Sequence, residues 1–488
     1  MPDRFDIAAP DPAGMVASLS SLGYSLEAAV ADLVDNSVSA KATKIDVAFT
    51  WDGEGSWVAV TDNGTGMSLP ELITAMTPAA RGLGAERTAE DLGRFGLGLK
   101  TASFSQARQL SVSSRAAGEE WHTRTWDLDL VEATRQWRLL HDADAETTRI
   151  LDLLRRDLDG GTVVLWRRLN GYGAEETDAD QTTQQQFYDD ANRVERHLGM
   201  VFARFLKDVD LRVQGQPVPA WDPFMTGHPS LQRLPPEDLA FGGSSVRVEA
   251  YVLPSAQKLS KDDYNAAGGP RGWLRQQGFY VYRRRRLILV GDWLGLPGMR
   301  QEEKFNLARI AIEVPAELDA EWSVDVRKSK VVPPVGLRRH LKRIAQRARE
   351  QSADVIRHRG QIAARRHGSV FVYPWRVDRP DGRIKCRINR DHPLVMEVLR
   401  TDAERRKVLK ALLTLLEETV PVEALRVMHE ADAADDPIPF GGDPSQHEEA
   451  VARAVQAALI NQGRSPAEAK AMIRDMDPFS RLRGFWSE

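Results

Sequence analysis

The segment LGRFGLGLKTA (92–102) combines glycines and a lysine in a pattern that suits phosphate binding. Gly93, Gly96 and Gly98 lead into a helix that we expect to begin near Leu99. Backbone N–H groups at a helix start bind phosphate, and Lys100 adds a point charge. The spacing is neither that of a Walker A loop nor, since no strand runs straight into it, that of a Rossmann fingerprint. A flexible glycine-rich loop is the alternative interpretation.

Two acidic motifs precede this segment. In ADLVDNSVSA (31–40), Asp32, Asp35 and Asn36 stand at i, i+3 and i+4, so a helix places them on one face. In TDNGTGM (61–67), Asp62 follows a β-rich run, and glycines relax the backbone so that its carboxylate can point into an open pocket. A solvated helix face and an ordinary loop are the alternatives.

The elements that must position these residues alternate between helix and strand. Ser25 is a plausible N-cap for a helix within 19–40, and strands are predicted at 44–50, 57–61, 110–114 and 161–165. The last of these begins in GGTVVLW (160–166), where Thr162 follows a glycine pair. The alternation predicts an α/β layer domain through about residue 175.

Taken together, the four motifs resemble those of the GHKL ATPase superfamily (gyrase B, heat-shock chaperone, histidine kinase, MutL), over about residues 15–170. The resemblance implies an α+β fold, the Bergerat helix-on-sheet sandwich, with ATP in a lidded pocket. It implies that Asn36 is the Mg²⁺ ligand and that Asp62 accepts from the adenine amino group. The remaining implied nucleotide contacts are the base-approach glycines Gly64 and Gly66, the packing residue Met67, the lid segment Gly93 to Lys100, and Thr162, which helps to anchor Asp62 and its water.

One position departs from that pattern. Most relatives have glutamate four residues before the asparagine, where it acts as general base, and this chain has Asp32. The charge is kept on a side chain that is one methylene shorter, so Asp32 is a slow base, a base acting through a second water, or only a binding residue. Glu27 lies about 140° around the helix from Asp32 and is the weaker candidate.

Within the superfamily, these motifs look most like MORC-type ATPases and their bacterial relatives. Downstream, HLGMVFARFL, LRVQGQPVPAWDPF and GFYVYRRRRLILVGDW resemble the transducer domain of MORC, MutL and gyrase B. In that family a transducer lysine reaches the γ-phosphate. SVDVRKSKVVPP (323–334) offers Lys328 and Lys330, with Lys330 slightly preferred, and a solvated basic loop is the alternative.

A long basic helix is predicted after Pro333-Pro334. Residues 336–367 hold ten Lys/Arg residues and two acidic residues, although the whole chain has a net charge of −4. The apolar stripe is thin, which favours a helix that binds DNA or RNA phosphates over one packed on a domain. A solvated helix that pairs with acidic residues elsewhere is the alternative. The residues that we expect to contact phosphate are Arg338, Arg339, Lys342 and Arg343. If residues 281–290 form a strand, alternate arginines of the run 283–286 face opposite sides of it, and an exposed hairpin edge is the alternative to a functional role.

Length and composition limit the classes to which the protein can belong. With 488 residues, 42% hydrophobic, the chain is long enough for about three domains with buried cores. A single cysteine argues for a reducing compartment, and no apolar run is long enough for a membrane helix, so a cytoplasmic protein is expected. The predicted domains are a GHKL ATPase domain (1–180), a transducer (181–335), a basic helical linker (336–368) and a small C-terminal domain (369–488) that we could not assign.

The leading hypothesis is a slow ATPase that acts as an ATP-dependent switch or clamp. ATP with Mg²⁺ would close the lid and strengthen a homodimer, and the transducer would relay this state to a bound polymer, most plausibly DNA. For bacterial MORC-like members the resemblance implies phage defence or DNA modification beside a nuclease or methyltransferase. A chaperone-like ATPase, which needs an exposed apolar surface, and a catalytically weak ATP-binding scaffold are the alternatives. A histidine kinase and a type II topoisomerase fit poorly.

Overall fold

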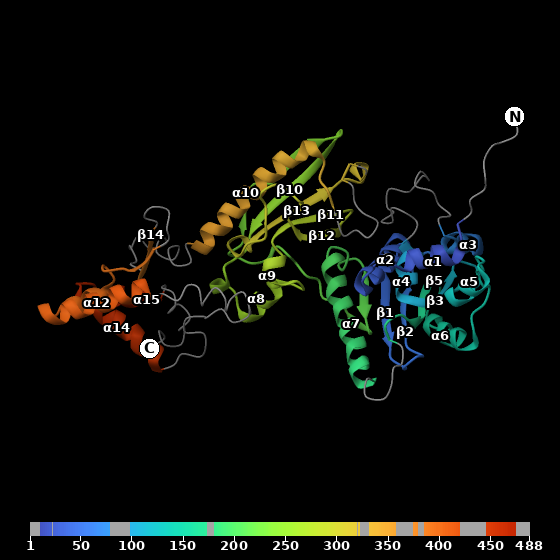
Figure 1. Cartoon of the computed structure of the whole chain (residues 1–488), viewed down its shortest axis with the longest axis horizontal. Helices are drawn as coiled ribbons and strands as arrows, with labels where there is room; N and C mark the ends of the chain where they lie inside the picture. The colour runs from blue at the N-terminus through green and yellow to red at the C-terminus, as the bar shows by residue number, and fades with distance from the viewer. Residues whose placement is uncertain are drawn as a thin grey trace. The chain divides into compact units, whose positions relative to one another are not determined.

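The computed structural model describes residues 10–21, 23–78, 98–172, 180–319, 321–322, 331–357, 374–378, 385–419 and 446–474. The chain forms two compact units, Met1–Asp354 and Val355–Glu488. The larger unit contains two mixed α/β layers, each built on its own sheet (Figure 1). This arrangement agrees with the α+β fold class expected from the sequence.

The first sheet has seven strands in the order β4-β3-β5-β2-β1-β6-β7. Only the β1–β6 pair is parallel; the other neighbours run antiparallel. The strands are β1 (Lys44–Thr50), β2 (Trp57–Asp62), β3 (Ala107–Arg115), β4 (His122–Asp127), β5 (Gly161–Leu169), β6 (Asp210–Val213) and β7 (Gln216–Pro217). Because β6 and β7 return to this sheet, it extends past the domain boundary that we predicted at residue 180.

Helices cover both faces of this sheet, as the period-2 alternation of strand side chains requires. Val58, Val60 and Trp166 point into the larger core, whereas Ala59, Val163 and Leu165 pack on the other face against α6. On the larger-core side, α2 packs against α4 and α7. The helices are α1 (Pro12–Ser20), α2 (Leu26–Ser39), α3 (Leu69–Met76), α4 (Gly98–Gln106), α5 (Leu128–Thr134), α6 (Ala145–Arg155) and α7 (Asp180–Val201).

The start of α2 follows directly from the sequence. Ser25 has an extended backbone, and its hydroxyl oxygen accepts from the backbone N–H of Ala28 at 3.4 Å, as the N-cap assignment predicted. Val30, Leu33 and Val34 are buried against the sheet. Capping and burial together fix the rotation of α2 about its axis, and therefore the direction in which its polar residues face.

The second sheet has six strands in the order β12-β11-β13-β10-β8, with β9 also paired to β10. β11 and β13 are parallel, so the chain crosses over between them. The strands are β8 (Gln232–Arg233), β9 (Glu237–Phe241), β10 (Ser244–Val252), β11 (Gly278–Arg283), β12 (Arg286–Asp292) and β13 (Ala308–Val314). The helices of this layer are α8 (Lys261–Gly268) and α9 (Gly272–Arg275), with short 3-10 turns at Ala256–Lys258, Glu303–Phe305 and Ala316–Leu318.

Helix α10 (Val335–Arg357) packs on this second layer (Figure 1). Its buried positions recur at helical spacing: Leu337, Leu341, Ile344, Ala345, Ala348, Ser352 and Ala353. Arg349 is also buried, over the Phe305 ring at 3.8 Å and 3.1 Å from Glu302. The expectation of only a thin apolar stripe was therefore wrong, because small residues and one paired arginine complete the packed face.

The second unit contains the hairpin β14 (Trp375–Asp378) and β15 (Lys385–Ile388), followed by helices. These are α11 (Pro393–Leu399), α12 (Ala403–Glu418), α14 (Gln446–Asn461) and α15 (Pro466–Arg474). Its described core is small and consists of Ala452, Val455, Leu459, Ala469 and Ile473. Within the described parts of the whole chain, no helix is long and apolar enough to cross a membrane.

Candidate functional site

Asp62 lies at the end of β2 with its carboxylate held on both sides. The Ser37 hydroxyl donates to Oδ2 at 2.7 Å, and the Gly64 backbone N–H donates to Oδ1 at 2.8 Å. Asp62 is 5% exposed, and this burial raises the pKa of its carboxyl, while hydrogen bonds from Ser37, Gly64 and Thr162 lower it in part. A carboxylate fixed in this way is oriented to accept a further N–H donor from a ligand.

Glycines allow the chain to close tightly around Asp62. Gly66 has φ +65°, and a Cβ there would lie 1.9 Å from the Arg115 carbonyl oxygen. Gly161 has φ +120°, and a Cβ there would lie 2.0 Å from the carbonyl oxygen of Asp62 itself. Larger residues would force these backbone segments apart. Gly66 was expected from the motif as a base-approach residue, whereas the requirement at Gly161 was missed.

A chain of hydroxyls links the other motif residues beside Asp62. Thr162 pairs with Asp62 across β5 and β2, and its hydroxyl lies 2.8 Å from the Ser114 hydroxyl. Ser114 in turn accepts from the backbone N–H of Met67 at 2.9 Å. The structure thus brings Asp62, Gly64, Gly66, Met67 and Thr162 together at one edge of the sheet. Neither Ser37 nor Ser114 had been singled out from the sequence.

Asp32 and Asn36 lie one turn apart on α2. Asp32 is 7% exposed and accepts from the Tyr24 hydroxyl at 3.2 Å, whereas Asn36 is exposed. A Cβ built on Gly98 would lie 3.5 Å from Oδ2 of Asp32, so this carboxylate stands beside the start of α4. The structure therefore places the candidate base next to the helix start that was predicted to bind phosphate.

Lys100 has a different environment from the one that its motif suggested. Its side chain is 3% exposed, and its ammonium donates to the Ala75 carbonyl oxygen at the end of α3, at 2.8 Å. This contact ties the first turn of α4 to α3. The predicted site residues Gly93, Gly96, Lys328 and Lys330 lie outside the described residues.

Asp35, the third polar residue of the helix motif, faces the second layer. Its Oδ1 accepts from Nε of Arg286 on β12 at 2.7 Å, and the two side chains are 2% and 7% exposed. The Arg286 guanidinium also lies over the Phe202 ring at 5.3 Å and donates to the Leu287 carbonyl oxygen at 3.0 Å. The pair connects the residue before Asn36 to a position 251 residues later.

An exposed hairpin edge was one interpretation of the four arginines 283–286, and within the described residues Arg283, Arg285 and Arg286 each bind a carboxylate. Arg283 binds Asp319, Arg285 binds Asp208, and Arg286 binds Asp35. Arg284 and Arg285 form the hairpin turn with φ 48° and 69°, a left-handed conformation that favours glycine or asparagine. The buried position of Arg286 corrects the expectation for that residue.

Residues 24–159 match the family of histidine kinase-, DNA gyrase B- and HSP90-like ATPases. No curated protein matches the chain. The family match covers α2, β2, the start of α4 and most of the residues around Asp62, and it ends just before Gly161 and Thr162 of β5. Together with the helix-on-sheet fold, it supports a GHKL-type ATPase domain that binds ATP in this part of the chain.

Proposed function

We propose that the protein is an ATP-dependent molecular switch that couples nucleotide state at α2 to the second layer and, through it, to DNA. ATP would bind with its adenine amino group at Asp62 and its phosphates near the start of α4. Asp32 would act as general base for slow hydrolysis, and the second layer would act as the transducer. On the sequence motifs of about the first 170 residues and of the second layer, we further propose that the protein belongs with the MORC-like members of the superfamily.

The observation that carries the proposal is the buried Asp35–Arg286 pair. Asp35 precedes Asn36, the residue proposed to contact the metal, and Arg286 begins a strand of the second sheet. A displaced α2 would break a charge pair that has little access to water, which is costly because each charge would remain buried. Movement at the nucleotide is therefore passed to β12.

The residues present fit a magnesium ion bound mainly through the nucleotide. Asn36 supplies one exposed oxygen ligand on the α2 face that carries Asp32, and Mg²⁺ prefers oxygen ligands together with waters and phosphates. The described residues contain no cluster of three or more His, Cys, Asp or Glu side chains that could hold a metal alone. When bound, Mg²⁺ would neutralise phosphate charge; the protein's own part is to orient the nucleotide and to remove a proton at Asp32.

The coupling is tested with a neutral double variant, Asp35→Asn with Arg286→Gln. The single change Arg286→Gln should lower the free energy of unfolding by about 3–5 kcal/mol because Asp35 stays buried and charged, and the double variant should recover most of that loss. We expect wild-type protein to change its DNA affinity when a non-hydrolysable ATP analogue is added. The double variant should lose this change while binding both ligands.

The matched control is Arg283→Gln with Asp319→Asn, an ion pair that joins the same hairpin to the 3-10 turn after β13 instead of to α2. It should keep the wild-type response to the analogue. A double variant at Asp35 and Arg286 that responds to the analogue as fully as wild type would remove the pair from the coupling.

We propose that ATP strengthens a homodimer of the ATPase domain. The sequence has glycines at 82, 84, 93, 96 and 98, in and beside the proposed lid, and a bound nucleotide that favours the associated form would shift the population toward it. Light scattering should show an increase toward twice the monomer mass with the analogue plus Mg²⁺. The Asp62→Asn variant should not respond, and an unchanged wild-type mass would count against nucleotide-gated association.

The outward face of α10 is the proposed DNA surface. Arg338, Arg339 and Arg343 are exposed and Lys342 is half-buried, although Arg343 also pairs with Glu237 and Arg338 donates to the Pro333 carbonyl oxygen. Changing all four to glutamate should weaken DNA binding by orders of magnitude and spare ATP affinity. The log–log salt slope should flatten by up to about 3–4 units, at about 0.9 per phosphate contact.

Filter binding at several salt concentrations measures this slope. Glutamate at four exposed arginines of the first layer, Arg135, Arg138, Arg149 and Arg156, supplies a charge-matched control that should retain most of the affinity. The loss at α10 should be similar for unrelated DNA sequences because phosphate contacts carry no base information. A variant of α10 with the wild-type salt slope would exclude this helix as the DNA-binding surface.

One observation favours a chaperone-like ATPase as the second candidate. On α12, Val408, Leu412, Leu415 and Leu416 are 47–69% exposed, which gives the described C-terminal unit the apolar surface that such a function requires. ATP turnover separates the two functions. Stimulation of ATP turnover by DNA supports the switch, which we propose to work in phage defence or DNA modification beside a nuclease or methyltransferase. Stimulation of ATP turnover by an unfolded protein alone supports the chaperone.

A further inference from the structure

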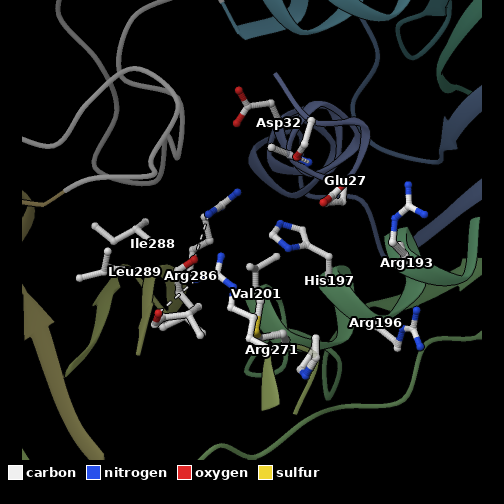
Figure 2. Close-up of a pocket in the computed structure, with 16 residues that line it drawn as sticks. Glu27, Asp32, Arg193, Arg196, His197, Val201, Arg271, Arg286, Ile288 and Leu289 are labelled. Carbon is white, nitrogen blue, oxygen red and sulfur yellow. Dashed lines mark hydrogen bonds between the residues drawn. The ribbon is translucent and has the colours of Figure 1, made fainter. Parts of the chain in front are cut away.

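A cavity of about 330 Å³ lies between α2, α7, the segment before α9 and β12. Figure 2 shows the Arg286 side chain and the His197 ring within it, below α2. Four arginines line the cavity. Arg193, Arg196 and Arg271 are exposed, and Arg286 is buried. Glu27 and Asp32 on α2 are its carboxylates.

The charges at the cavity are only partly neutralised by the protein. Arg193 pairs with Asp190 and Arg286 with Asp35. In the described part of the chain, neither Arg196 nor Arg271 has a carboxylate at ion-pair distance, and Arg271 donates to the Val290 carbonyl oxygen at 3.3 Å. These two guanidiniums, which come from different elements, can therefore turn toward an anion in the cavity.

His197 reports a positive potential in the same place. Burial, followed by the charges of Arg286 and Arg271, lowers the pKa of His197 to about 3. The imidazole is thus neutral at physiological pH, although a carboxylate, Asp35, is near enough to oppose the shift. The part of this pKa shift that comes from Arg286 and Arg271 reflects positive charges that would also attract an anion.

The cavity adjoins the phosphate end of the proposed nucleotide site. Asp32 lines the cavity, and its Oδ2 also stands 3.5 Å from the position of a Cβ on Gly98 at the start of α4. Asp32 therefore borders both the cavity and the helix start at which the phosphates are proposed to lie.

The size of the cavity limits its ligand. Its volume of about 330 Å³ is at the small end of ligand sites, which run from about 300 to 1,000 Å³. That space holds a tetrahedral oxyanion with several waters, since each water occupies about 30 Å³. Guanidinium groups match phosphate oxygens through paired N–H donors. The chemistry and the volume together favour a small phosphate-class anion.

We propose that this cavity binds inorganic phosphate, the product of ATP hydrolysis, at a place separate from the nucleotide. The inference rests on the proposed hydrolysis: water attacks the γ-phosphorus, the bond to the β–γ bridging oxygen breaks, and the water's proton passes to Asp32 and then to solvent. The products are ADP and hydrogen phosphate. Because Arg286 lines the cavity and binds Asp35, bound phosphate stands beside the pair that links α2 to β12.

The test is titration of the full-length protein with inorganic phosphate, followed by calorimetry, with saturating ADP present or absent. Wild-type protein should bind one phosphate, and ADP should not displace it. Arg271→Glu and Arg196→Glu should each weaken phosphate binding by about tenfold or more, since each removes a charged donor and adds an anion. Arg275→Glu, an exposed arginine on α9 that does not line the cavity, is the matched control.

Three outcomes would overturn the inference: no saturable phosphate binding, affinity unchanged in both cavity variants, or displacement by ADP, which would assign the phosphate to the nucleotide's own site. ATP affinity, measured separately, distinguishes this failure from failure of the proposed function. A chain that binds and hydrolyses ATP yet binds no phosphate contradicts the cavity assignment alone, whereas a chain that never binds ATP contradicts the proposed function.

Discussion

Replacing Asp62 by asparagine is expected to abolish measurable ATP binding while the protein remains folded. The carboxylate accepts from the Ser37 hydroxyl on one oxygen and from the Gly64 N–H on the other. An amide in the same place has one oxygen and one NH₂ group. If the NH₂ faces the Gly64 N–H, a buried donor is left unpaired, at about 1–3 kcal/mol; if it faces Ser37, that hydroxyl must turn to accept from it. In both arrangements one of the two acceptor oxygens is lost, which is expected to weaken the proposed adenine contact.

Calorimetric titration with an ATP analogue measures the effect, and thermal unfolding confirms that the variant is folded. Asp46→Asn is a close control, because Asp46 lies on the adjacent strand β1 and burial also raises the pKa of its carboxyl. Asp46 does not belong to the motif, so its variant should bind ATP like the wild type. ATP affinity that is the same in both variants and the wild type would move adenine recognition away from Asp62.

The parts of this site that the sequence predicted are local in the chain. The hydroxyl of Ser25 caps α2 by accepting from the N–H of Ala28, three residues later. At the end of β2, the carboxylate of Asp62 accepts from the N–H of Gly64, two residues later. Such contacts depend on short-range backbone geometry, which residue types and spacing largely specify. The helix face shared by Asp32 and Asn36 is predictable for the same reason.

The contacts that the sequence did not predict join distant segments. Nothing near Arg286 distinguishes it from the three arginines before it, and its partner Asp35 lies 251 residues away. The parallel pairing of β1 with β6 likewise depends on the chain's return after α7. On α10, Ala345 and Arg349 also belong to the packed face, and an arginine does not stand out as apolar in a hydropathy pattern. Tertiary packing, which decides these cases, leaves no periodic signal of its own.

Replacing Asp32 by alanine is expected to leave ATP affinity nearly intact and to lower turnover by about 10²-fold or more, the usual contribution of a general base. The carboxylate is well placed for this role. It is buried and oriented by the Tyr24 hydroxyl, and it stands beside the start of α4, where the phosphates are proposed to lie. Adenine recognition is proposed to take place at Asp62, so the binding contacts there should survive the change.

Asp32→Glu distinguishes a base from a structural carboxylate, because the cavity beside Asp32 can accommodate one more methylene. Turnover at or above the wild-type rate is expected if reach limits the native residue. Glu27→Gln, on the same helix and lining the same cavity, should hydrolyse ATP normally. The rate of ATP turnover of all three variants is measured as phosphate release at steady state. Normal ATP hydrolysis by the Asp32→Ala variant would assign the role of general base to Glu27 or to a water chain. A wild-type protein that binds ATP without turnover would instead be an ATP-binding scaffold, because the shorter Asp32 carboxylate would not reach the attacking water.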